Sequence, residues 1–160
     1  MQFIRHGIAS RIILIGIYAI AMGYLEAVVV YYIRYALGDV HATATVASSI
    51  TGRFPWAIEM TREVATLLML AAVAWLAGRD RRERAAALLW AFGIWDATYY
   101  LGLKILAQWP PSIATQDVYF LLPVPWGGPV WVPLLADALM AVLAGWLVVG
   151  RRPLAGAAIR

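Results

Sequence analysis

The segment Trp56–Leu76, WAIEMTREVATLLMLAAVAWL, decides the fold class of this chain. From Val64 onward it carries no charged residue, and a helix of about 20 residues is long enough to cross the hydrocarbon core of a bilayer. Three other segments are similar in length and composition: Ile12–Ile33, Ala85–Ala107 and Val130–Val149. With 63% hydrophobic residues, 14% charged residues and a mean hydropathy of +0.74, the chain is too apolar for a soluble domain. The sequence therefore predicts an all-α polytopic membrane protein, a four-transmembrane-helix bundle that forms a single domain over residues 1–160.

Basic residues gather on one side of this predicted bundle. Nine of the thirteen precede the first segment, join the second to the third, or follow the fourth: Arg5, Arg11, Arg79, Arg81, Arg82, Arg84, Arg151, Arg152 and Arg160. The positive-inside rule makes that side cytoplasmic, so both termini are expected inside and the two longer loops outside. We expect an integral protein of the plasma or inner membrane that contacts membrane lipids. The basic clusters are short and lack interleaved aromatic residues, which argues against a nucleic-acid partner.

Acidic residues inside the apolar segments are the main functional signal. Four of the nine lie deep, one in each segment: Glu26, Glu63, Asp96 and Asp137. Three of them are seven residues from the predicted outer end, or about 10 Å at 1.5 Å per residue, and Asp96 is one turn deeper. An ionised carboxylate at such a depth costs about 3 kcal/mol or more, so it usually faces a cavity or a partner. The pattern predicts an acid-lined pocket in the outer half of the bilayer.

Helical spacing supplies partners for these acids. Glu59 and Glu63 are four residues apart on one side of the second segment, and Arg62 lies three residues after Glu59. A Glu59–Arg62 pair would leave Glu63 as the unpaired acid.

The third segment carries a second polar face. Tyr99, Tyr100 and Lys104 follow Asp96 by three, four and eight residues, so the four share one face of a helix. Lys104 either extends to the outer interface or bends inward toward an acid such as Glu63. Contacts of this kind between acids, bases and tyrosines also suit a purely structural role in holding the bundle together.

Proline and tryptophan dominate the second outer loop. It opens with Trp109-Pro110-Pro111 and continues through Pro123, Pro125, Trp126 and Pro129. Proline at this density excludes regular helix and predicts irregular backbone. Two interpretations stay open, namely an interfacial loop with an aromatic belt, or a lid over the acidic site. The remaining acids, Asp39, Asp80, Glu83 and Asp117, are expected to be solvated loop charges.

Neither a metal site nor a cofactor is predicted. The chain has no cysteine, its two histidines (His6 and His41) lie outside the apolar segments, and no Glu-x-x-His motif is present.

Three functions fit the acidic layer. The first is a binding or transport protein whose pocket binds or translocates a cation or a proton, with tryptophan and tyrosine rings able to attract an organic cation. The second is a membrane-embedded acid–base enzyme acting on a lipid or an isoprenoid, so whether the protein is an enzyme stays open. The third is an accessory subunit whose acids pair with a membrane-complex partner. A homo-oligomer is a further alternative, because four spans enclose little volume. Ten residues are candidates for ligand binding or proton handling: Glu26, Glu59, Arg62, Glu63, Asp96, Tyr99, Tyr100, Lys104, Trp126 and Asp137.

Overall fold

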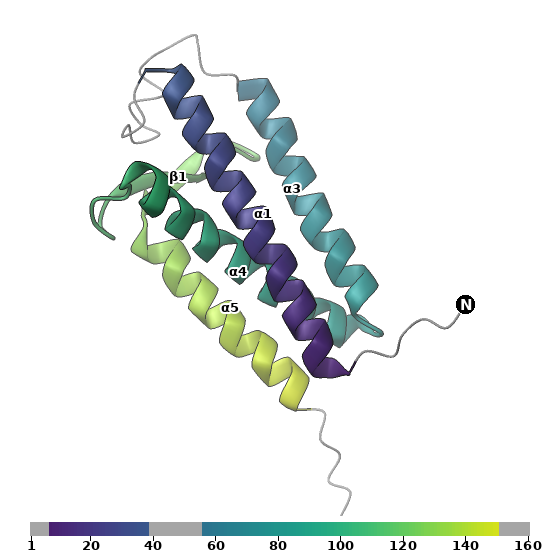
Figure 1. The fold of residues 1–160 in the computed structure, drawn as a ribbon. Coiled ribbons are helices and arrows are strands. Elements are labelled where there is room, and N and C mark those ends of the chain that lie inside the picture. The colour runs from purple at the N-terminus through teal and green to yellow at the C-terminus, as the bar shows by residue number, and fades with distance from the viewer. Residues whose placement is uncertain (1–6, 39–55, 151–160) are drawn as a thin grey trace, which may run out of the picture.

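Four helices and one β-hairpin make up the computed structural model, which describes residues 7–38 and 56–150 (Figure 1). The element order is α1 (Ile8–Ala36), α3 (Trp56–Ala77), α4 (Arg81–Ala107), β1 (Gln116–Phe120), β2 (Trp126–Pro129) and α5 (Trp131–Val149). These bounds agree with the four predicted segments to within a few residues at each end. The predicted loop over 39–55, with Asp39 and His41, and the terminal residues His6, Arg5, Arg151, Arg152 and Arg160 lie outside the described residues.

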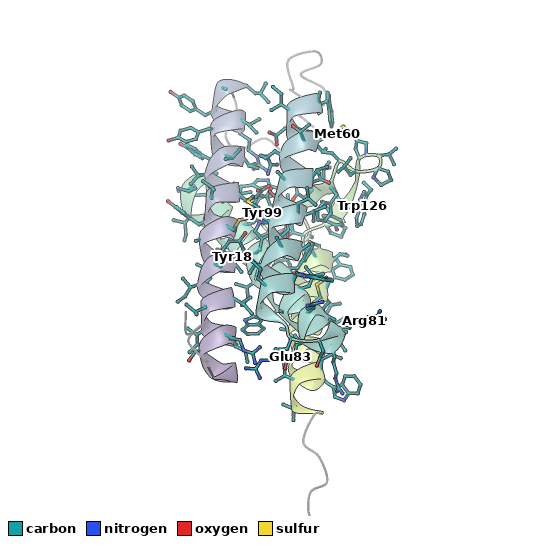
Figure 2. All side chains as sticks on the ribbon, turned by 90° about the vertical axis from the view of Figure 1, so that its right-hand side faces the viewer. Tyr18, Met60, Arg81, Glu83, Tyr99 and Trp126 are labelled. Atoms are coloured by element: carbon teal, nitrogen blue, oxygen red, sulfur yellow. The ribbon has the colours of Figure 1, made fainter. Side chains whose placement is uncertain are left out.

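The helices run alternately up and down, so the bundle has two distinct ends (Figure 1). At the arginine end lie the start of α1, the turn between α3 and α4, and the end of α5. At the hairpin end, α1 and α4 finish, α3 and α5 begin, and β1 pairs with β2. Figure 2 marks the two ends, with Arg81 and Glu83 near the first and Met60 and Trp126 toward the second.

Three of the four described helices are long and apolar enough to cross a membrane: α1 over Ser10–Ala36, α3 over Trp56–Ala77, and α5 over Trp131–Val149. The fourth, α4, is not among them: besides the four charged residues at its start it carries Asp96, Lys104 and several tryptophan, tyrosine and glycine residues. Its position explains this composition, since α4 is the central helix and packs against α1, α3 and α5. A helix surrounded by protein needs fewer lipophilic side chains than one that faces lipid.

Small residues set the crossing of α1 and α4. Ala19 and Ala27 are fully buried, and Gly23 lies between them one turn from each. A Cβ atom built on Gly23 would collide with the carbonyl oxygen of Trp95 and approach the Cβ of Thr98 to 2.8 Å. The two backbones therefore touch at this point, as in other membrane helix pairs that meet through small residues.

The proline-rich loop contains regular structure that the sequence did not predict. Strands β1 and β2 pair antiparallel, with Gln116 opposite Pro129 and Asp117 opposite Gly128, and the register shifts between Val118 and Phe120. The prolines do not break this ladder because Pro123 and Pro125 lie in the connection and Pro129 is the last residue of β2.

Glu83 is also placed differently from its prediction as a solvated loop charge. Its carboxylate forms a partly buried ion pair with Arg11 of α1 at 3.2 Å and accepts the backbone N–H of Arg79 at 2.8 Å. These contacts lower the pKa of Glu83, with the Arg79 N–H making the largest contribution. Asp80 is the N-cap of α4, since its side chain accepts the N–H of Glu83 at 2.9 Å.

The close α1–α4 crossing yields a direct test. Gly23→Ala is expected to lower the free energy of unfolding by about 1–3 kcal/mol, because the added methyl group has no room against Trp95. Gly145→Ala in α5 is the matched control, since a Cβ there meets nothing within 4 Å. The measurement is thermal unfolding of both variants in one detergent. Equal behaviour of the two variants would contradict the crossing.

Candidate functional site

A polar cavity lies between α1, α3, α4 and β1 toward the hairpin end. Its volume is about 120 Å³, which is room for several water molecules or a small polar ligand. Both aromatic and charged side chains line it. The charged ones are Glu26, Arg34, Glu59, Arg62, Glu63, Asp96 and Asp117, and the rings are Trp56, Trp95, Tyr99, Tyr100, Tyr119 and Phe120.

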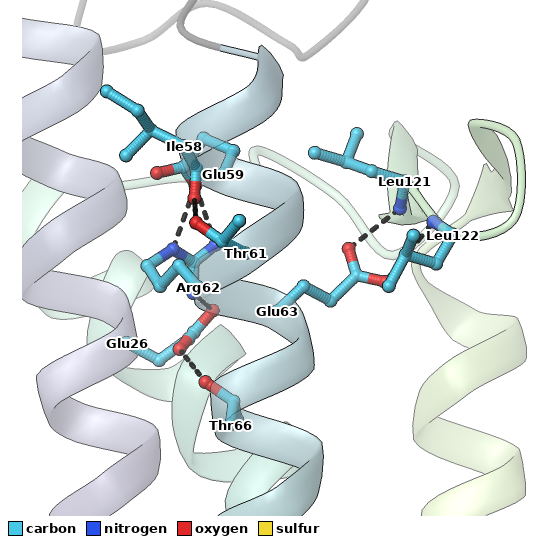
Figure 3. A network of polar contacts seen from close by, with 9 residues as sticks. All are labelled: Glu26, Ile58, Glu59, Thr61, Arg62, Glu63, Thr66, Leu121 and Leu122. Atoms are coloured by element: carbon cyan, nitrogen blue, oxygen red, sulfur yellow. Dashed lines mark hydrogen bonds and ion pairs between the residues drawn. The ribbon is translucent and has the colours of Figure 1, made fainter.

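Arg62 joins two carboxylates from two helices (Figure 3). Its guanidinium forms an ion pair with Glu59 at 2.7 Å within α3 and another with Glu26 of α1. Thr66 donates a hydrogen bond to the second Glu26 oxygen at 3.4 Å. The predicted Glu59–Arg62 pair is therefore present, and Glu26 shares the same cation. This network links α1 to α3 between two apolar helices, where a lone charge is costly.

Glu63 points away from that network, toward the hairpin (Figure 3). Its two oxygens accept the backbone N–H groups of Leu121 at 2.8 Å and Leu122 at 3.3 Å. The sequence left Glu63 as an acid without a basic partner. In the structure it has none among the described residues, but its charge is stabilised by two main-chain donors and holds the end of β1 against α3.

Asp96 of α4 and Asp137 of α5 form a carboxyl pair. The two side chains lie within hydrogen-bonding reach of each other. They meet because Gly93, one turn before Asp96, lets α5 approach closely: a Cβ on Gly93 would lie 3.1 Å from the carbonyl oxygen of Asp137. One buried oxygen of Asp137 accepts no N–H or O–H donor. Two like charges this close in a buried site repel each other, and a proton shared between the two carboxyl groups would relieve that repulsion.

The position of Asp117 differs most clearly from the sequence prediction. It was expected to be a solvated loop charge, yet it is buried on β1 and accepts the hydroxyl of Tyr100 at 2.9 Å. Burial raises the pKa of Asp117, while the Tyr100 hydrogen bond and the nearby Arg34 oppose that rise.

Arg34 lies in the last turn of α1 and is only 6% exposed. Its guanidinium stacks on the indole of Trp109, with 4.1 Å from its central carbon to the ring centroid. Trp109 reaches this place because α4 ends at Ala107 and Gln108 adopts a left-handed backbone, with φ of 54°. Trp109 in turn stacks on Tyr100, with 6.3 Å between the ring centroids. One nitrogen of Arg34 is buried without an acceptor.

The other predicted site residues are divided between the cavity and its surroundings. Tyr99 lines the cavity and packs edge-on against Tyr100. Lys104 and Trp126 are exposed and absent from the lining. Lys104 donates to the carbonyl of Pro110 at 2.8 Å instead of meeting Glu63, and Trp126 stacks on the outer side of Phe120, with ring centroids 5.9 Å apart.

Beyond the cavity, toward the arginine end, the bundle is apolar. Ile15, Ala19, Leu70, Ala74, Ala87, Ala91 and Trp95 form one buried cluster there. Within residues 7–38 and 56–150, no group of three or more histidine, cysteine, aspartate or glutamate side chains is placed to hold a metal ion.

Sequence reasoning missed three contributors to this site. Arg34 directly follows the first apolar segment, Thr66 lies within the second, and Asp117 precedes the apolar run VYFLL. The last of these had a usable signal, because a charged residue that opens an apolar strand next to the membrane rarely stays in open water.

Comparisons with protein-family models, with curated proteins and with solved structures found no match for this chain.

The contact between Glu63 and the hairpin is testable by amide hydrogen exchange. Glu63→Gln is expected to speed exchange at Leu121 and Leu122 about tenfold, since a hydrogen bond to a charged acceptor is worth about 1.5 kcal/mol or more. Glu59→Gln is the matched control, because Glu59 bonds to Arg62 and not to the hairpin. Unchanged exchange in the Glu63 variant would show that this carboxylate does not hold the strand.

Proposed function

We propose that this chain is a small integral membrane protein that binds a cation, in exchange for a proton, in the acid-lined cavity at the hairpin end. In this proposal all four helices cross the bilayer, the arginine end is cytoplasmic and the hairpin covers the outer mouth of the cavity. The observation that carries the proposal is the excess of negative charge among the described residues that line the cavity.

The cavity lining carries more acidic than basic side chains. Five carboxyl groups line the cavity, those of Glu26, Glu59, Glu63, Asp96 and Asp117, against the two guanidinium groups of Arg34 and Arg62. Full ionisation would leave a formal charge of 2 − 5 = −3, a costly state in a low-dielectric site. Bound protons or a bound cation relieve it.

Asp96 is the carboxyl group best placed to hold the cation. Glu26 and Glu59 share Arg62, Glu63 accepts two main-chain donors, and Asp117 accepts the Tyr100 hydroxyl. Asp96 instead faces a second acid, Asp137, and forms no ion pair with a basic side chain in the described part of the chain. In this proposal the two carboxyl groups share a proton. A cation entering the cavity would replace this proton.

Aromatic rings favour an organic ammonium over a metal ion. Trp95 and Tyr99 flank Asp96 in the sequence of α4 and line the same cavity. Ring faces attract alkylammonium groups by about 0.5–2 kcal/mol each when water is excluded. The apolar cluster beyond the cavity supports binding over conduction, because it offers no polar path toward the arginine end.

Binding is tested by calorimetric titration of ethylammonium into the purified protein. Asp96→Asn is expected to weaken binding at least tenfold, about 1.4 kcal/mol, because the ion loses its carboxylate. Asp80→Asn is the matched control: the same change at the far end of α4, where asparagine also caps a helix. Equal affinities of wild type and the Asp96 variant would refute the assignment.

The proton exchange has its own readout. Titrations in two buffers of different ionisation enthalpy are expected to show about one proton released for each ethylammonium bound by wild type, because the shared proton of the Asp96–Asp137 pair leaves. The Asp96 variant is expected to release none. A second assay, ethylammonium flux into proteoliposomes, separates binding from transport.

The proposed topology follows from the arginines and is tested by labelling. The chain has no cysteine, so single cysteines report cleanly. In intact cells, a membrane-impermeant maleimide is expected to label Ile113→Cys near the hairpin and to leave Arg81→Cys unlabelled until the cells are lysed. Ile113 and Arg81 both have exposed side chains. The reverse pattern would place the arginine end outside.

A further inference from the structure

We propose that the ligand of this cavity is a zwitterion, with an ammonium group held at Asp96 and an oxyanion held by the buried guanidinium of Arg34. This inference rests on the proposed cation site and adds a second recognition point to it. The required chemistry is an ammonium group joined by a short linker to a carboxylate or a phosphate.

Arg34 is the observation that points to the anion. It lines the cavity and is more than nine-tenths buried, and it forms no ion pair with any carboxylate in the described part of the chain. Its buried Nη1 lacks an acceptor. Leaving a buried cation with unsatisfied donors is costly, so such a group usually awaits an acceptor.

The surroundings hold the Arg34 guanidinium in a fixed plane. One face of it rests on Trp109, which stacks on Tyr100. Stacking leaves the edges of the fork as the parts able to bind, and the planar fork suits two oxygens of one carboxylate or phosphate.

Asp117 also lines the cavity but forms no ion pair with Arg34. Its carboxylate is held by the Tyr100 hydroxyl at 2.9 Å, on a strand that is fixed by β2 and by Glu63. Nη1 of Arg34 therefore stays without an acceptor in the described part of the chain.

The two recognition points belong to one cavity. Asp96 of α4 and Arg34 of α1 both line it, and its volume is about 120 Å³. A ligand whose two charges are separated by a short linker suits one small cavity better than two independent ions. A free amino acid or aminoalkyl phosphate has this chemistry, and so does an ethanolamine phospholipid headgroup.

The experiment compares three soluble probes by calorimetry: O-phosphoethanolamine, ethylammonium and inorganic phosphate. Wild type is expected to bind O-phosphoethanolamine at least tenfold more tightly than either half alone. Arg34→Gln is expected to remove this advantage while changing the affinity for ethylammonium less than twofold. Lys104→Gln is the matched control, a cation lost at the same end but outside the cavity, and is expected to change neither affinity.

Each other outcome has a definite meaning. Equal affinity of wild type for O-phosphoethanolamine and ethylammonium overturns the zwitterion proposal and leaves the cation site intact. Loss of both affinities in Arg34→Gln, with Arg34→Lys restoring both, also overturns it, since Arg34 would then only shape the cavity. If phosphate binds through Arg34 and ethylammonium does not bind, the proposed cation function fails and so does the zwitterion.

A nanodisc arm distinguishes the two sources of the ligand. If the ligand is the headgroup of a lipid, discs of phosphatidylethanolamine are expected to abolish binding of O-phosphoethanolamine, and discs of phosphatidylglycerol are expected to preserve it. If the ligand is a free zwitterion, binding is the same in both discs. Absence of O-phosphoethanolamine binding in phosphatidylglycerol discs and in detergent alike overturns the proposal for both sources.

Discussion

The high cost of an unpaired charge in an apolar environment governs how this bundle is arranged. Glu26 and Glu59 share Arg62, and Glu63 accepts two main-chain N–H groups. These contacts tie α1 to α3 and α3 to the hairpin, so the same interactions that neutralise charge also fix the walls of the cavity. Among the charged side chains in and beside the cavity, two keep a buried polar atom without a hydrogen-bond partner in the described residues: Asp137, which faces Asp96, and Arg34. The function proposed for the protein rests on these two exceptions.

Close backbone packing brings these charged side chains near enough to one another to pair. Gly23 brings α1 onto α4, and Gly93 brings α5 onto α4 at the level of Asp137. Because α4 packs against the other three helices, it can carry Asp96, Tyr99 and Tyr100 toward the interior while α1, α3 and α5 present many large apolar side chains outward. The central helix is thus the least lipophilic of the four described helices, and it carries the acid at which the proposed cation binds.

Much of this was readable from the sequence. Segment length and hydropathy predicted the four described helices, and a three-residue spacing predicted the Glu59–Arg62 pair. The ion pair between Glu26 and Arg62 was not predictable. Helical periodicity indicates which residues share a face of one helix, but it does not indicate which neighbouring helix packs against that face. The hairpin was missed because a high proline content excludes a helix but does not indicate which segments pair as strands. The paired segments are Gln116–Phe120 and Trp126–Pro129. Asp117 and Arg34 were misjudged or overlooked for a related reason, since their burial depends on the hairpin and on Trp109.

The central claim is that Asp96 holds a cation inside the cavity. The most direct measurement is a crystal structure of the protein with 2-bromoethylammonium, whose bromine can be located by anomalous scattering. The account predicts one bromine peak within the cavity lined by Trp95, Asp96 and Tyr99, and no such peak in the Asp96→Asn variant. An empty cavity at saturating ligand in wild type, or a peak that persists unchanged in the variant, would contradict it.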